Sequence, residues 1–96
     1  MRVATTEEFD SIVAIRGGVA YVDLATHGCC SGGLRVVEVT MSPPRGAAAY
    51  RTFTAGRIRV AVGPSVGRGP DELALEMTGR RRRSPRGTWD GCAFVP

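Results

Sequence analysis

The chain has 96 residues and a net charge of +4, a size that predicts one small domain, residues 1–96, with a modest core. No apolar run approaches the ~20 residues that span a bilayer, so we expect no membrane partner. The N-terminal segment turns acidic soon after Arg2 and lacks the apolar stretch of a secretory signal. Together with an odd number of cysteines, three, this favours a cytoplasmic protein with reduced thiols.

The positive charge comes from 13 arginines, and the chain contains no lysine, asparagine or glutamine. This bias is typical of a G+C-rich, presumed bacterial genome, so an arginine here is weaker evidence for nucleic-acid binding. The densest cluster, residues 80–83 with Arg86, can bind phosphate or an acidic partner. Only Trp89 lies near enough in sequence to stack on a base. We therefore favour a solvated loop and expect no nucleic-acid partner.

The first expected element is a short amphipathic helix over residues 6–15. Thr5 and Glu8 have the spacing of a capping box, and apolar residues then recur at helical spacing. Gly17 and Gly18 end the pattern.

From Val19 onward the pattern is that of strands and turns. Alternating, β-branched segments predict strands over 19–24, 34–40, 50–54, 57–62 and 88–95, with 72–77 a strand or short helical turn. Ala55-Gly56 is expected as a hairpin turn, and loops are expected over 42–46, 63–70 and 80–87. One helix and five or six short strands make the chain mainly β.

Two adjacent cysteines occupy a glycine-rich segment between two expected strands, with the sequence Thr26-His-Gly-Cys-Cys-Ser-Gly-Gly33. The glycines around Cys29 and Cys30 let the backbone bend sharply and approach a ligand closely. Ser31 and the neighbouring N–H groups can hydrogen-bond a thiolate or a cluster sulfide. A third cysteine, Cys92, also follows a glycine.

Thiolates are soft ligands that suit iron–sulfur clusters, zinc or copper(I). One chain supplies three of them, one fewer than a four-thiolate cluster site needs, so a homodimer or a non-cysteine ligand has to complete it. A buried cysteine can instead serve as a small apolar side chain. Two adjacent strand cysteines cannot both face one core, which favours ligation or redox chemistry for Cys29 and Cys30. For Cys92, ligation or redox chemistry and a structural role are equally favoured.

His27 and two aspartates flank these thiols. His27, two residues before Cys29, can ligate a metal as neutral imidazole or lower the pKa of a thiol as imidazolium. An ordinary polar loop residue is the alternative, and the more common one. Asp23 and Asp90 can orient His27 or backbone groups, but a strand-end carboxylate that faces water is the more common case and the one we expect. No phosphate-binding loop and no Ser/His/Asp arrangement is present.

The order of helix, strand, Gly-Cys-Ser-Gly-type loop, alternating strands and C-terminal Gly-Cys resembles the HesB-like superfamily, which contains the A-type iron–sulfur carriers. Gly28-Cys29-Cys30-Ser31-Gly32 matches their first cysteine motif with one cysteine inserted, and Cys30 is the better positional match. Gly91-Cys92, 62 residues after Cys30, stands where the carriers have a Cys-Gly-Cys-Gly ending. The resemblance implies a compact β-sandwich or flattened barrel with one N-terminal helix.

The resemblance also implies binding and transfer of an iron–sulfur cluster or iron, with Cys29, Cys30 and Cys92 as ligands and Cys92 folded back beside the pair. A homodimer and iron–sulfur assembly or recipient proteins are the implied partners. The chain departs from the carriers in its single C-terminal cysteine and its vicinal pair. The pair resembles a HesB-like branch in which one cysteine can be selenocysteine, which points to redox chemistry. A thiol–disulfide oxidoreductase is therefore the alternative, and an adaptor acting through its arginines a weaker third.

Overall fold

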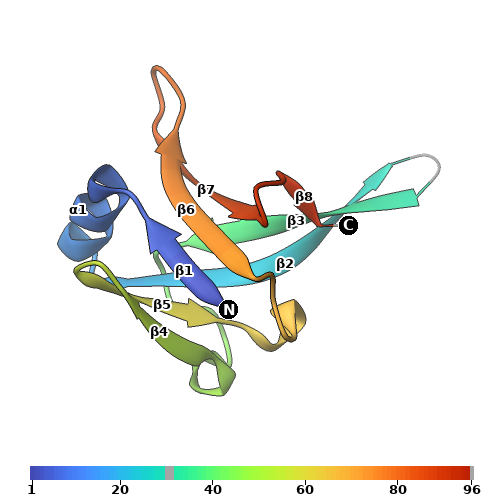
Figure 1. Cartoon of the computed structure of the whole chain (residues 1–96), viewed down its shortest axis with the longest axis horizontal. Coiled ribbons are helices and arrows are strands. Elements are labelled where there is room, and N and C mark those ends of the chain that lie inside the picture. The colour runs from blue at the N-terminus through green and yellow to red at the C-terminus, as the bar shows by residue number, and fades with distance from the viewer. Residues whose placement is uncertain (30–31, 96) are drawn as a thin grey trace.

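The structure, a computed structural model, describes residues 1–29 and 32–95, and of residues 27, 29 and 32 it describes the backbone alone. Two mixed sheets and one helix form a sandwich, with strand orders β1–β6–β7 and β4–β5–β2–β3–β8 (Figure 1). The expected mainly β sandwich with one N-terminal helix is confirmed. The bounds are β1 Arg2–Thr5, α1 Glu7–Ile15, β2 Val19–Cys29, β3 Gly32–Thr40, β4 Arg51–Ala55, β5 Ile58–Val62, β6 Glu72–Thr78, β7 Ser84–Trp89 and β8 Phe94–Val95, with 3-10 turns at Ala47–Ala49 and Pro64–Val66.

The N-terminal segment begins as a strand, which the sequence patterns did not predict. β1 pairs in parallel with β6, so Thr5 is extended and the helix cap falls on Thr6, one residue later than predicted. The Thr6 Oγ1 accepts a hydrogen bond from the Phe9 N–H at 3.2 Å. Glu8 is consequently not part of a capping box, and its carboxylate pairs with Arg83 instead.

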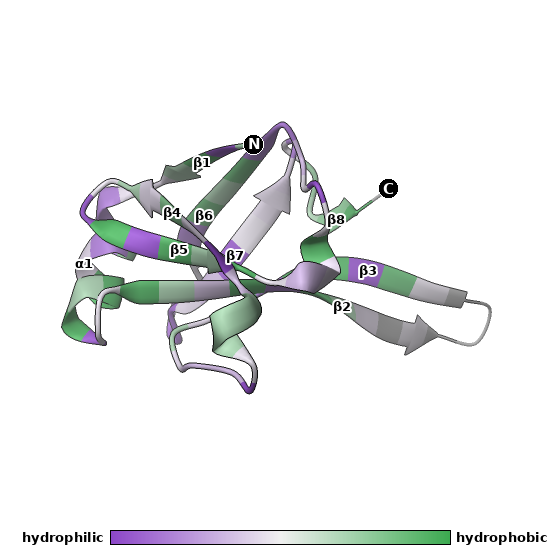
Figure 2. Cartoon of the chain, turned by 90° about the horizontal axis from the view of Figure 1, so that it is seen from below, coloured by the Kyte–Doolittle hydropathy of each residue, from purple (hydrophilic) through white to green (hydrophobic). Residues whose placement is uncertain are grey.

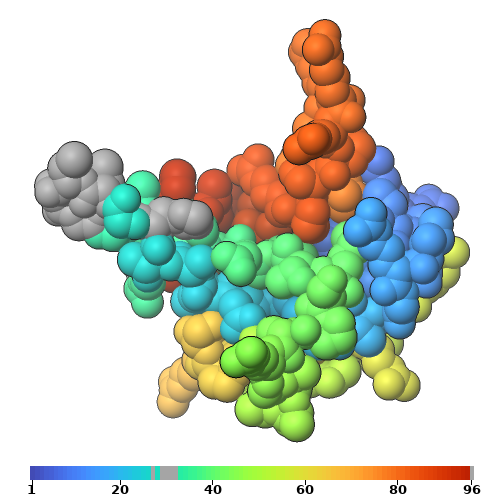
Figure 3. All heavy atoms as spheres, turned by 180° about the vertical axis from the view of Figure 1, so that it is seen from behind, coloured from blue at the N-terminus to red at the C-terminus, as the bar shows by residue number. Residues whose placement is uncertain are grey.

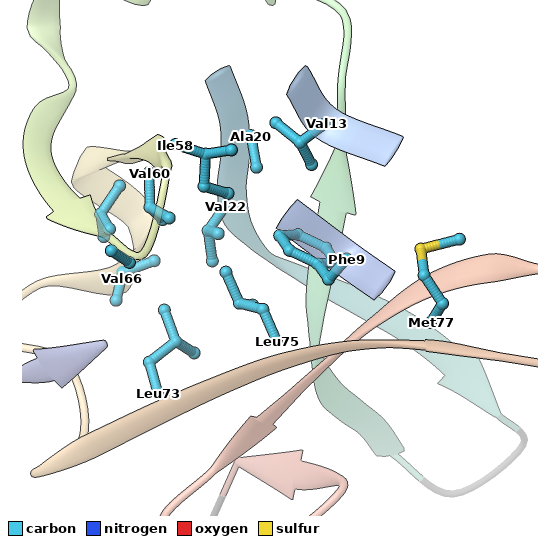
Figure 4. Close-up of a cluster of buried hydrophobic side chains, with 12 residues drawn as sticks. Phe9, Val13, Ala20, Val22, Ile58, Val60, Val66, Leu73, Leu75 and Met77 are labelled. Atoms are coloured by element: carbon cyan, nitrogen blue, oxygen red, sulfur yellow. The ribbon is translucent and has the colours of Figure 1, made fainter. Parts of the chain in front are cut away.

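The core lies between the two sheets and under α1. Phe9 and Val13 of the helix meet buried side chains of β2, β5 and β6 (Figure 4). On β2 and β3 the inward positions include Val22 and Val39, which pair across the strands. Burying each large aliphatic or aromatic side chain contributes about 1.5–3 kcal/mol to folding. The core therefore fixes the inner half of the β2–β3 hairpin.

The hairpin of β4 and β5 turns at Gly56-Arg57, close to the predicted Ala55-Gly56. Gly56 has a φ of +55°, and a Cβ at this position would lie 2.0 Å from the Oδ2 of Asp10. Asp10 is buried beneath the turn, and its Oδ2 accepts a hydrogen bond from the Arg57 N–H at 3.4 Å. Glycine is thus required both by the backbone angle and by the close approach of α1.

The C-terminal region differs from the single strand predicted over 88–95. β7 already begins at Ser84, so half of the expected connector is a strand, with Pro85 on an edge where no further ladder forms. The chain then reverses at Asp90-Gly91, whose φ angles of +49° and +83° suit a two-residue hairpin turn. β8 follows and adds to β3. No helix among the described residues has the length and apolar character to cross a membrane.

Candidate functional site

The β2–β3 hairpin carries the first cysteine motif at its end. Its nine rungs run from Tyr21↔Thr40 to Cys29↔Gly32, so both strands are longer than the predicted 19–24 and 34–40. The outer rungs extend beyond the body of the sandwich (Figure 2). The backbones of His27 and Cys29 therefore belong to β2 and pair with Leu34 and Gly32. Cys30 and Ser31 lie outside the described residues.

Cys92 follows the Asp90-Gly91 turn and is exposed, with a free thiol. Its backbone is bridged to Trp89: the Cys92 N–H donates to the Trp89 carbonyl at 2.9 Å, and the Trp89 N–H to the Cys92 carbonyl at 2.8 Å. Two residues later β8 joins β3 through only two paired positions, Arg35↔Val95 and Val36↔Phe94. The segment after Cys92 therefore joins the sheet of the hairpin, whereas Cys92 itself is bridged to β7 of the other sheet.

Cys92 does not lie at the rung of Cys29 in this arrangement. Phe94 pairs with Val36, which is four residues from Gly32, or roughly 13 Å at a strand rise of ~3.3 Å per residue. β8 runs antiparallel to β3, towards the hairpin end, so Cys92 lies on the far side of Phe94. Among the described residues, no three of the His, Cys, Asp and Glu side chains are grouped as metal ligands. A three-cysteine site stays a prediction.

Apolar side chains are exposed on the sheet between the two cysteine segments. Leu34 of β3 and Phe94 of β8 are 53% and 52% exposed. Phe94 pairs with Val36, which in turn pairs with Ala25 of β2, so these three side chains share one face of the sheet. This apolar strip of Ala25, Val36, Phe94 and Leu34 reaches the rung of His27, because Leu34 pairs with His27, and the rung of Cys29 follows two residues later.

Asp23 organises a polar cluster at the base of the same hairpin, rather than facing water as expected. Its Oδ2 accepts a hydrogen bond from the Tyr50 hydroxyl at 2.5 Å and its Oδ1 from the Ser65 hydroxyl at 3.0 Å. This bond to Asp23 is the main reason that the pKa of Tyr50 rises to about 12, with desolvation second. Asp90 is likewise bonded, because its Oδ1 accepts from the Glu72 N–H at 2.8 Å.

No sequence pattern links Tyr50 and Ser65 to Asp23, since they lie 27 and 42 residues from it in the chain. The ring of Tyr50 also packs edge-on against Tyr21, with centroids 6.2 Å apart. Gly63 completes the cluster, because a Cβ there would lie 2.1 Å from the Asp23 Oδ1. The cluster fastens the segments around β4 to β2 and so braces the base of the hairpin.

The two mixed sheets and the single helix form a fold that a solved structure shares. A solved structure with this fold is that of Escherichia coli SufA, a protein involved in the biosynthesis of iron–sulfur clusters. The match has a TM-score of 0.55 and covers 90% of this chain and 78% of SufA, with 12% sequence identity. No family model matches the chain, and no curated protein sequence matches it significantly. The fold implied by the HesB-like resemblance is confirmed, and the likeness is one of fold.

Proposed function

We propose that the protein binds and transfers an iron–sulfur cluster or iron in the cytoplasm, with the cluster as its cargo. The observation that carries the proposal is the rung Cys29↔Gly32, which lies at the end of a hairpin that extends beyond the core of a SufA-like fold (Figure 2), with Cys30 the next residue in the sequence. A ligand pair in such a place is reachable by another protein without unfolding the sandwich. Soft thiolates supply the coordination chemistry.

Two chains provide a complete ligand set without any rearrangement of β8. The Cys29 and Cys30 pairs of two hairpins supply the four thiolates that a cluster requires. The apolar strip with Leu34 and Phe94 next to those rungs supports such a dimer, because exposed apolar side chains favour contact with a second protein surface. Cys92 joins the site as a further ligand when the two-residue β8 separates from β3 and the backbone bridge between Cys92 and Trp89 opens.

Reconstitution with ferrous iron and sulfide tests the carrier proposal. After anaerobic desalting, the wild-type protein is expected to retain iron and show sulfur-to-iron charge-transfer bands in its visible spectrum. Cys29→Ser and Cys30→Ser should each lose most of the iron, whereas Cys92→Ser should retain it if the hairpin pairs suffice. The chain with all three cysteines changed to serine is the blank. A wild-type protein as colourless as this blank would refute the proposal.

Thiol–disulfide exchange is the second candidate function, favoured by the separation between Cys92 and the rung of Cys29. In this reaction one thiolate of the pair attacks a disulfide of a substrate protein and forms a mixed disulfide. The other cysteine then attacks, which leaves a Cys29–Cys30 disulfide and a substrate reduced to two thiols. A colourless protein that reduces a disulfide substrate, and fails to do so as Cys29→Ser or Cys30→Ser, would favour this function over cargo binding.

A further inference from the structure

An apolar groove lies between the end of α1 and the turn end of the β6–β7 hairpin. Its volume is about 360 Å³, within the usual range for sites that take a small ligand or a few side chains. Ile15 at its edge is 85% exposed, and Met77 of β6 is buried within its wall. The remaining apolar lining comes from Ile12, Met41 and Pro85.

The arginine loop, residues 79–83, rises from the rim of this groove. It connects the last rung of the β6–β7 hairpin, Thr78↔Ser84, and forms the column that projects from the body in Figure 3. The Arg83 guanidinium donates to the Gly79 carbonyl at 2.6 Å, to the Met77 carbonyl at 3.2 Å and to the Glu8 carboxylate. Arg83 thus connects the two ends of the loop and links the loop to α1.

Three arginines of the loop are left to face outward. Arg80, Arg81 and Arg82 are exposed, and within residues 1–29 and 32–95 none of them has a hydrogen bond or ion pair. The segment from Met77 to Trp89 contains five arginines and no acidic residue. Arg16 adds a further positive charge at the groove. An apolar groove is therefore bordered on one side by a concentrated positive charge.

We infer that the groove and the arginine loop together form a docking site for an acidic, amphipathic segment of a partner protein. Protein interfaces combine an apolar core with a charged rim, and this site has both parts. The carboxylates of the segment pair with Arg80, Arg81 and Arg82, whose planar guanidinium groups suit carboxylates. An apolar side chain of the segment enters the groove beside Ile15.

Nucleic acid would use only half of these features. Phosphate contacts engage the arginines but leave the apolar groove empty, and the loop itself has no aromatic side chain on which a base could stack. The spacing also suits an extended peptide. Arg81 is four residues from Met77, so an extended segment of about four residues reaches from the groove to the loop tip.

The test measures binding of a fluorescent peptide to the full chain by anisotropy at about 50 mM salt. The peptide carries two leucines, a two-residue spacer and three glutamates, and is prepared in both chain directions. The variant R80Q/R81Q/R82Q should weaken binding about tenfold, the effect of losing three exposed ion pairs. Ile15→Ser should weaken it by a similar factor through the lost apolar contact.

A matched control separates the site from net charge. Arg45, Arg59 and Arg68 are exposed and lie outside the loop, so R45Q/R59Q/R68Q removes the same charge and should leave the affinity within about twofold. Equal losses in both triple variants would overturn the proposal, as would binding that Ile15→Ser does not change. A duplex DNA that binds more tightly than either peptide, with a steep salt dependence that R80Q/R81Q/R82Q abolishes, would make the loop a nucleic-acid contact instead.

Discussion

Asp23 shows how a single side chain acquires a role that its position in the sequence does not reveal. Strand alternation places it on the face of β2 away from the core, where a solvated carboxylate was expected. In the folded chain, the segments before β4 and after β5 bring Tyr50 and Ser65 to its two oxygens. Hydrogen bonds to an ionised carboxylate are stronger than those between neutral groups. The two bonds to Asp23 therefore stabilise the base of the hairpin.

The Tyr50 hydroxyl should make the stability of the fold pH-dependent at alkaline pH. Its pKa is about 12 in the folded chain and 10 in the unfolded chain. The contribution of the protonated hydroxyl to the free energy of unfolding is therefore complete below pH 10 and is lost as the pH rises from 10 to 12. The chain has no lysine, so few other groups titrate in this window. Urea midpoints measured from pH 8 to pH 12 should fall less for Tyr50→Phe than for the wild type. Tyr21→Phe, which keeps the Tyr50 hydroxyl, should fall like the wild type, and parallel curves for all three proteins would contradict this expectation.

At the scale of elements, β8 is the least secured strand. It consists of Phe94 and Val95, pairs with β3 alone among the described strands, and leaves Phe94 half exposed. The tight Asp90-Gly91 turn holds the chain as far as Cys92 through both backbone bonds to Trp89. The residues after Cys92 can therefore separate from β3 while Cys92 stays bridged to Trp89.

Removing β8 should leave the sandwich folded. A chain that ends at Ala93 loses two paired positions and little buried area, so the free energy of unfolding should fall by about 1 kcal/mol or less. Far-ultraviolet circular dichroism and urea denaturation would measure the change. Leu75→Ala, which truncates a core side chain, serves as the comparison and should cost about 2–5 kcal/mol. A truncated chain as unstable as Leu75→Ala would show that β8 is integral to the sheet.

For the whole molecule, the hairpin end and the arginine loop occupy different ends of the sandwich (Figure 1). The proposed cargo site and the proposed docking site can therefore be occupied together. The apolar strip with Leu34 and Phe94 borders the first site, and the apolar groove borders the second. A dimer formed through the hairpins leaves both arginine loops accessible to partner proteins.

Cargo binding is expected to stabilise the dimer, because a ligand that binds only the assembled form shifts the equilibrium towards it. Analytical ultracentrifugation should show a larger dimer fraction after reconstitution with iron and sulfide than for the apo protein. Cys30→Ser should reduce this shift more than Cys29→Ser, since Cys30 directly precedes Ser31-Gly32 as in the carriers. Leu34→Ser should weaken the dimer with or without cargo. A monomer under both conditions, without retained iron, would leave the vicinal thiols as a redox pair.

The amino-acid sequence determined the elements with strong local patterns: the helix after the N-terminal threonines, the alternating strands and the turn at Gly56. It also located the candidate thiols, because residue type and neighbouring glycines are local properties. Only the tertiary structure decided how far the β2–β3 hairpin extends, that Arg2–Thr5 is a strand on β6, and where Cys92 lies relative to Cys29. Those features depend on pairing between segments distant in sequence. A strand that is stabilised by such pairing does not need an alternating pattern of apolar residues in its own sequence. The hydrogen bonds of Asp23 are likewise a property of the folded chain, since bonds between residues distant in sequence form only after the sheets have packed. The same holds for the arginine loop, where the contacts of Arg83 decide which arginines face outward.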